Sequence, residues 1–273
     1  MSLLEQFHQQ VRLAGREDEP SPGIVLDTDG PVRRRYPERP HTSYCMVECP
    51  EGLGDDPDHW INRQVEFFTG RRDRVEWKVY SYDQPADLAE RLARAGFVAE
   101  EVETLLLGDV DGLVHDVELP AGVRLRAVTS DADLARVDDL MKTIWGPDHG
   151  DGSLTREMHA NPEGLDVVLA EESPDGPALC AAWLRYTPGT DFASMWGGST
   201  LPEWRRQGLY RATVSRRARL ARDRGYRYMR LDTSPDSRPI LERLGLRAVA
   251  TTTPYVLDAR PSNVEGRLTA HSP

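Results

Sequence analysis

The chain has 273 residues, more than one domain usually contains, so we expect two compact halves. Its composition of 39% hydrophobic and 29% charged residues is typical of a folded globular protein, and no run of about 18 apolar residues is present to span a membrane. The net charge of −11 disfavours a chain-wide role in nucleic-acid binding, because phosphate contacts need a basic surface.

The N-terminus and the cysteines bear on where the protein works. The first ten residues, MSLLEQFHQQ, lack the basic segment and apolar core of a secretory signal and predict an amphipathic helix. Cys45, Cys49 and Cys180 are too few and too scattered for a disulfide framework, and no second pair of ligands completes a zinc site. We therefore expect buried cysteines, no metal and a reducing, cytoplasmic location.

The first half has weak turn signals early and clearer elements later. In chain order, the pattern predicts a short strand at 23–26, a strand at 42–49, a helix from Pro57 to about residue 70, a strand at 75–82, a helix at 87–95 and a strand at 102–108. Residues 109–120 show no strong period, so the linker is expected there. This predicts an N-terminal domain at 1–112, a second domain at 119–259 and a mobile tail at 260–273.

The second half reads as a longer series of strands and helices. The pattern predicts a strand at 123–128, a helix capped by Ser130 and running to about residue 145, a short helix at 154–160, strands at 166–171, 178–186 and 192–201, a long helix at 209–225, a strand at 227–232, a helix at 237–244 and a closing strand at 248–257. This order predicts an α+β fold around a mixed sheet. Residues 89–97 (AERLARAGF) are similar to 241–246 (LERLGL), so either one strand–helix–strand unit is used twice or two amphipathic helices merely end alike in glycine.

The most informative segment runs from Ser199 to Ala212, with the sequence STLPEWRRQGLYRA. A strand ends at a proline, a tight loop follows, and a long helix begins near Leu209. Such a loop points several backbone N–H groups at one spot, where the positive end of the helix dipole adds its field. Gly208 allows the chain to take torsions barred to other residues and to approach a ligand closely. The segment is therefore suited to phosphate oxygens.

This segment resembles the acetyl-CoA loop of the GNAT-type N-acetyltransferase superfamily. The matching residues are Leu201-Pro202 and then Arg205-x-x-Gly208-x-Tyr210, where Tyr210 departs from the small residue usual at the last position. The second motif of the superfamily is matched more loosely, by Ser234, Ser237, Leu241, Arg243, Gly245 and Leu246. The resemblance covers about residues 120–258. The N-terminal half would then be a degenerate GNAT-like domain without a cofactor loop, and the whole chain a tandem.

The resemblance implies a mixed sheet that opens between its fourth and fifth strands, here 192–201 and 227–232. Pantetheine would lie there and pair with the main chain at Ser199, Thr200 and Leu201, while Ser234 and Ser237 contact the cofactor from the other wall. The pyrophosphate would bind the N–H groups of the loop and helix start. The residues assigned to the loop are Arg205, Arg206, Gln207, Gly208, Leu209, Tyr210 and Arg211. Two glycines after Trp196 predict a bulge or close ligand approach, or simply the place where the strands separate.

Enzymes of this type need a base for the attacking amine, a donor for the developing oxyanion and an acid for the thiolate. A backbone N–H near Leu201 is the expected oxyanion donor. The candidates for acid and base are Asp232, Ser237 and Tyr255, although Asp232 also suits a turn cap. The usual tyrosine acid is replaced by Leu241, and a thiolate with a conjugate-acid pKa near 8.5 does not strictly need a strong acid.

These observations predict an acetyl-CoA-dependent N-acetyltransferase in which a primary amine of a small molecule or peptide attacks directly in a ternary complex. The alternative is a non-catalytic acyl-CoA-binding sensor, because the usual acid is missing. Ten arginines and one aspartate lie between residues 205 and 230, and a solvated face beside an anionic cofactor explains them better than a nucleic-acid module. We expect no nucleic-acid or membrane partner and a monomer or homodimer.

Overall fold

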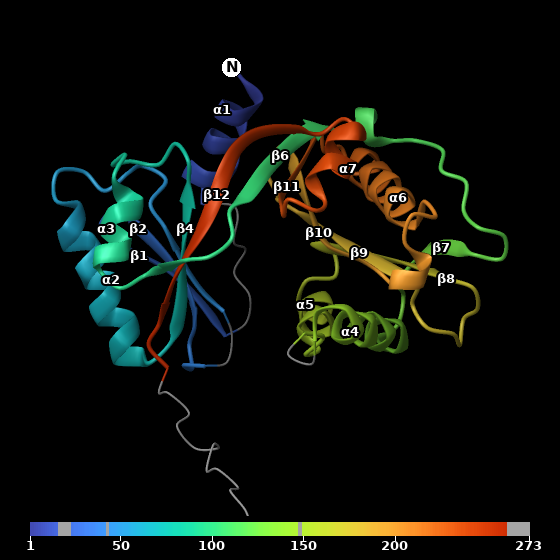
Figure 1. Cartoon of the computed structure of the whole chain (residues 1–273), viewed down its shortest axis with the longest axis horizontal. Helices are drawn as coiled ribbons and strands as arrows, with labels where there is room; N and C mark the ends of the chain where they lie inside the picture. Colours follow the sequence, from blue (N-terminus) through green and yellow to red (C-terminus); the bar gives the residue numbers. More distant parts are fainter. Residues whose placement is uncertain (16–22, 42–43, 147–148, 261–273) are drawn as a thin grey trace, which may run out of the picture. The chain divides into compact units, whose positions relative to one another are not determined.

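A computed structural model gives the fold and describes residues 1–15, 23–41, 44–146 and 149–260 (Figure 1). The chain divides into two compact units. Unit 1 comprises Met1–Pro22 and Glu103–Thr251, and unit 2 comprises Gly23–Val102 and Thr252–Pro273. The units therefore differ from a simple division at 112–119, since each includes a segment from the other half of the chain. The predicted tail at 261–273 lies outside the described residues.

Unit 1 is built on a mixed sheet in the strand order β6-β11-β10-β9-β8-β7. The strands are β6 (Glu103–Asp109), β7 (Arg124–Ala127), β8 (Leu165–Glu171), β9 (Cys180–Tyr186), β10 (Phe192–Thr200) and β11 (Tyr228–Thr233). Neighbouring strands are antiparallel except β10 and β11, which are parallel. The predicted mixed sheet is thus confirmed, and its single parallel pair lies at the centre of unit 1.

Helices cover both faces of this sheet (Figure 1). They are α4 (Asp131–Trp145) and α5 (Ser153–Ala160) on one face, and α6 (Leu209–Asp223) and α7 (Arg238–Arg243) on the other, with short 3-10 turns at Asp111–Leu113 and Pro202–Trp204. Alternation along β10 sends Ala193 and Met195 into the core beneath α6, so Ser194 and Trp196 lie on the α4 face. Burial of one stripe of each helix explains why this sequence forms two layers around the sheet.

The N-terminal segment belongs to unit 1 because it buries side chains there. Helix α1 (Leu3–Phe7) starts with a capping box between Ser2 and Glu5 and continues as a π-helical turn, His8–Leu13. Phe7 is fully buried, with its ring edge-on to Phe192 at 5.9 Å between centroids. Gln10 donates to the Asp191 carboxylate at 2.9 Å and accepts from the Asp191 N–H at 2.8 Å. The predicted amphipathic helix is confirmed, and its apolar face packs on the start of β10.

Unit 2 contains the strands in the order β1-β2-β3-β4-β12 and has its own core. Its strands are β1 (Ile24–Asp29), β2 (Val32–Pro37), β3 (Cys45–Glu48), β4 (Arg74–Tyr80) and β5 (Val98–Ala99), and β12 (Arg247–Asp258) contributes its last residues. Helices α2 (Pro57–Arg71) and α3 (Leu88–Arg94) complete it. Asp56 caps α2 by accepting from the His59 N–H at 3.2 Å, and Pro57 occupies the first turn, as the sequence predicts.

Strand β2 was not predicted. Its sequence, VRRRYP, lacks the usual apolar alternation, but its arginines find partners after folding. Arg34 donates to the Gln64 side chain at 2.6 Å and pairs with Asp29 at 2.5 Å. A charged residue can therefore occupy this half-buried strand because its guanidinium is satisfied by residues far along the chain.

Candidate active site

The central feature of unit 1 is the separation of its two parallel strands. Strands β10 and β11 pair from Phe192–Tyr228 only as far as Ser194–Arg230. Beyond these residues β10 continues to Thr200 paired with β9, and β11 continues to Thr233 paired with β6. Residues 195–200 of β10 and 231–233 of β11 therefore do not pair with each other. The predicted opening between the fourth and fifth strands is present at this place.

A β-bulge interrupts β10 just where it parts from β11. The register with β9 shifts between Trp196 and Ser199, so Gly197 and Gly198 have no register partner on the described strands. Gly197 has a positive φ of 64°, and a Cβ there would lie 1.9 Å from the ring of Trp183. Only glycine fits this position, because both its torsion and its contact exclude a side chain. The sequence alternative of a bulge is confirmed.

The second glycine explains the unusual tyrosine of the loop motif. A Cβ on Gly198 would lie 2.4 Å from the Cε2 atom of Tyr210, so the ring of Tyr210 occupies the space next to this glycine. The glycine at position 198 therefore makes room for the large residue at the end of the motif, twelve positions later. The Tyr210 ring packs against β10, while its backbone N–H stays at the start of α6.

A buried arginine lies behind the bulge. Arg217 on α6 is 1% exposed, and its Nη1 atom donates to the carbonyls of Trp183 and Trp196, each at 3.2 Å. Its Nε atom donates to the Thr213 carbonyl at 3.1 Å. The C=O and N–H of one trans peptide point in opposite directions, so holding the Trp196 carbonyl turns the Gly197 N–H away from Arg217. The sequence did not single out this residue among the many arginines of α6.

The loop from β10 to α6 presents a run of unpaired backbone donors. Gly208 is the N-cap of α6 with a φ of 87°, and Arg206 also has a positive φ, of 62°. Among the described residues, the N–H groups from Arg206 to Arg211 have no hydrogen-bond acceptor, and the first that has one is Ala212, which donates to the Gly208 carbonyl at 2.9 Å. Six donors thus lie in the loop and first turn at the positive end of a 15-residue helix, which suits an anion.

The side chains of the predicted loop residues have different roles. Arg205, Arg206, Gln207 and Arg211 are exposed, whereas Leu209 is buried in the core. The Arg205 Nε atom donates to the Thr200 carbonyl at 3.2 Å, and the Gln207 amide donates to the Glu203 carbonyl at 2.9 Å. Leu209 therefore offers a ligand its N–H only, while the arginines offer charge.

The main chain at the end of β10 narrows the expectation of an oxyanion donor near Leu201. The Leu201 N–H itself donates to the Leu179 carbonyl at 2.9 Å. Successive N–H groups along a strand point to opposite edges, so the neighbouring Thr200 N–H points to the edge that β11 has left. The Ser199 side chain is 2% exposed and accepts from Trp145 Nε1 at 2.8 Å. Thr200 thus offers its N–H at the open edge.

The opposite wall carries the predicted polar residues of the second motif. The Ser237 hydroxyl lies 2.5 Å from that of Thr233 and 3.3 Å from that of Ser234. Asp232 is half-buried on β11, two residues after Arg230 and on the same sheet face as Arg230 and Ser194. Asp232, Ser234 and Ser237 thus all lie at or just after the end of β11, with Asp232 on the opposite face of the strand from Thr233, which contacts Ser237.

Two other positions fall outside this cluster. Leu241 is fully buried in the core beneath α7, so no donor stands at the position where the superfamily usually has tyrosine. Tyr255 lies in unit 2, where it pairs with Trp77 and Ala99 and packs against the core. Unit 1 alone thus contains two of the three predicted acid–base candidates.

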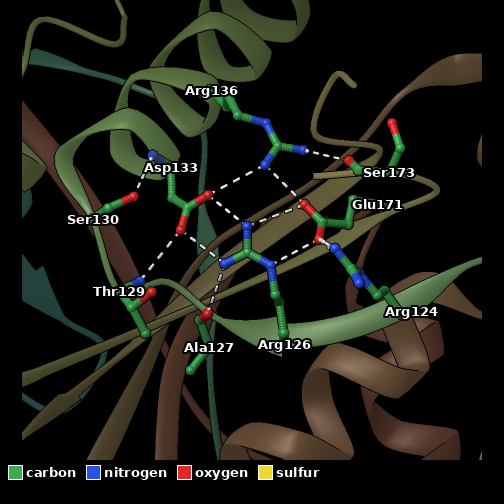
Figure 2. Close-up of polar contacts among 9 residues, drawn as sticks. All are labelled: Arg124, Arg126, Ala127, Thr129, Ser130, Asp133, Arg136, Glu171 and Ser173. Carbon is green, nitrogen blue, oxygen red and sulfur yellow. Dashed lines mark hydrogen bonds and ion pairs between the residues drawn. The ribbon is translucent and has the colours of Figure 1, made fainter. Parts of the chain in front are cut away.

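An ion network fixes α4 to the sheet (Figure 2). Arg126 on β7 donates to Asp133 through Nη1 at 2.7 Å and to Glu171 through Nε at 2.7 Å, and Arg136 lies 2.8 Å from Glu171. Burial alone would raise the pKa of Glu171, but the hydrogen bonds from Arg126, Arg136 and Arg124 outweigh it and lower the pKa to about 2. Because α4 ends at Trp145, the network also fixes the helix that reaches Ser199.

The described residues contain no group of three or more His, Cys, Asp or Glu side chains arranged to hold a metal ion. All three cysteines are buried, and none of them forms a disulfide among the described residues. Within the described ranges, every helix is too short or too polar to cross a membrane.

Comparison with known proteins identifies the fold. No protein-family model matches the sequence, and no curated protein matches it significantly. A GCN5-related N-acetyltransferase from Kribbella flavida aligns over 94% of this chain and 96% of its own, with 18% identity and a TM-score of 0.73. An N-acetyltransferase of the same type from Sphaerobacter thermophilus covers 94% and 92%, with 15% identity and a TM-score of 0.64.

A tandem GNAT protein from the clavulanic acid biosynthesis pathway is also similar, at 15% identity and a TM-score of 0.61 over 95% of this chain and 96% of its own. These alignments span nearly the whole chain, so they include both units. The chain therefore has the fold of the GCN5-related N-acetyltransferases, in a tandem arrangement.

Proposed function

We propose that the protein is an N-acetyltransferase that binds acetyl-CoA in unit 1 and transfers the acetyl group to a primary amine. The observation that carries this proposal is the combination of a parted strand pair and six unpaired N–H donors from Arg206 to Arg211. The fold alone supports an acyltransferase, and these donors support the choice of cofactor. The same loop in the sequence resembles the acetyl-CoA loop of the superfamily.

The residues fit the cofactor in two places. The N–H groups at the start of α6 would hold the pyrophosphate, with Arg205, Arg206 and Arg211 supplying charge at the exposed rim. The open edge of β10 would hold the pantetheine arm through main-chain groups such as the Thr200 N–H. The serines at the end of β11 would face the arm from the other wall.

When bound, acetyl-CoA supplies the thioester that the amine attacks. The chain's part is to place a donor where negative charge develops on the carbonyl oxygen, and we assign this to the Gly197 N–H. Gly197 lies in the bulge, where it has no register partner on the described strands, and its N–H is turned away from Arg217, which holds the preceding carbonyl. A fixed dipole of this kind needs no reorganisation during the reaction.

Asp232 is assigned as the base that removes the proton from the acceptor ammonium. It lies on the same sheet face as Trp196, across the unpaired edges of β10 and β11. The departing thiolate takes its proton from water or from the Ser237 hydroxyl, because buried Leu241 offers none. This last observation also favours the second candidate function, a sensor that binds acyl-CoA without turnover.

The test is an amine panel assayed for acetylated product by mass spectrometry and for thiol release from acetyl-CoA. An enzyme yields both products in equal amounts with at least one amine. Tight binding of acetyl-CoA with no acetylated product from any amine would favour the sensor instead.

A further inference from the structure

Two exposed tryptophans stand on the α4 face of the sheet, next to the bulge. Trp145 is 56% exposed and Trp196 is 42% exposed, and both belong to unit 1. Large exposed aromatic side chains gathered near one site can mark a ligand-binding surface. Trp183, whose ring lies against Gly197, completes this tryptophan face, which we define as Trp145, Trp183 and Trp196.

Both exposed indoles are held in fixed orientations. Trp145 donates from Nε1 to the Ser199 hydroxyl at 2.8 Å, and Trp196 donates from Nε1 to the Ser194 hydroxyl at 2.8 Å. Since Ser194, Trp196 and Ser199 lie along one strand on one face, the two rings flank the residues where β10 bulges. Rings fixed in this way lose little conformational entropy when a ligand stacks on them.

The charged groups beside the rings are already paired with one another. Arg185 lies over the Trp196 ring, with its Cζ atom 4.9 Å from the centroid. Glu157 binds the same guanidinium through two hydrogen bonds, of 2.6 Å to Nε and 2.7 Å to Nη2. This pair offers no net charge to a second cation or anion of the acceptor. The surface therefore favours a ligand that is apolar away from its amine.

We propose that the acceptor is an amine carrying an aromatic ring, which stacks on the tryptophan face while the amine reaches the bulge. This inference rests on the proposed function and names its substrate class. Aromatic pairs gain from offset or edge-on contact beyond simple burial, which an aliphatic polyamine or a small amino acid does not offer. The distance from ring to amine would be short, because Trp196 directly precedes Gly197.

The test compares kcat/KM for three probes: 2-phenylethylamine, n-propylamine and spermidine. We expect 2-phenylethylamine to be the best substrate. Trp196→Ala and Trp145→Ala should each lower its kcat/KM relative to that of n-propylamine about two- to tenfold, the value of one aromatic pair. Trp60→Phe, in unit 2, is the matched control and should change neither. Acetyl-CoA affinity, measured by calorimetry, should stay the same in all variants.

The outcomes separate the substrate class from the proposed function. Faster acetylation of spermidine or n-propylamine, or tryptophan variants that lower all three rates alike, would overturn the aromatic acceptor while the acetyltransferase stands. If the protein dimerises with increasing concentration and Trp145→Ala abolishes the dimer, a second copy covers the tryptophan face. That result would also overturn the aromatic acceptor. Acetyl-CoA binding without acetylation of any amine would overturn the proposed function and this inference with it.

Discussion

Replacing Arg217 by methionine is the most informative perturbation of the bulge. Burial lowers the pKa of this guanidinium, and the described residues contain no carboxylate in an ion pair with it. It contacts the Tyr210 side chain and main-chain carbonyls, two of which belong to the bulged strand and its neighbour. Methionine has a similar length and fills the space without the charge.

The expected change in stability is small because two terms oppose each other. Losing the bonds to Trp183 and Trp196 costs about 1.5–3 kcal/mol each, the usual value for hydrogen bonds to a charged group. Removing an uncompensated buried charge regains several kcal/mol of desolvation. We therefore expect the free energy of unfolding to change by less than about 2 kcal/mol. Catalysis should suffer more, because loosening one oxyanion donor costs about 10²-fold in kcat.

The assay measures urea denaturation and steady-state kinetics with an amine that the wild type acetylates. Arg217→Met should lower kcat while the KM for acetyl-CoA stays nearly constant. Arg222→Met, at the exposed end of the same helix, is the matched control and should behave as wild type. An unchanged kcat, or a loss of kcat that merely follows a loss of folded protein, would refute the role assigned to the Trp196–Gly197 peptide.

Three further predictions follow from the same structure. Leu241→Tyr should lower the free energy of unfolding by about 1–3 kcal/mol and should not raise kcat, because the position is fully buried. Denaturation measures the first effect and steady-state kinetics the second. The pKa of Glu171 is lowered to about 2, so its contribution of up to about 3 kcal/mol is present above pH 4.5 and lost as pH falls toward 2; Glu171→Gln should remove that part of the pH dependence in denaturation curves. Finally, kcat/KM should rise with pH as the acceptor amine deprotonates, with no decline at any pH up to about 9. A decline at high pH that persists in Ser237→Ala and Tyr255→Phe would reveal a missed acid.

The sequence predicts local features of this fold well, because they depend on neighbouring residues. The cap at Ser130, the proline at the start of α2 and the loop before α6 were all predictable from residues a few positions apart. The exchange of segments between the units was not, since the burial of Phe7 against Phe192 joins residues far apart in the chain.

The site was predictable in its loop and less so in its strands. Gly198 makes room for Tyr210, and that match appears only once helix and strand pack together. Arg217 has the same local sequence signal as the exposed arginines of α6, so only tertiary structure distinguishes it. The sequence placed the oxyanion donor only near Leu201, and the pairing of the Leu201 N–H with the Leu179 carbonyl, which narrows that choice, comes from the adjacent strand region.

Titration calorimetry of acetyl-CoA against wild type, Gly208→Glu and Gly225→Glu tests the central claim most directly. Gly208 and Gly225 have φ values of 87° and 86° at the two ends of α6, so glutamate brings similar backbone strain and the same charge to both. We expect one acetyl-CoA site per chain in the wild type, and we expect Gly225→Glu to keep this site and Gly208→Glu to abolish it. Unchanged affinity in a folded Gly208→Glu protein, or two sites per chain, would contradict it.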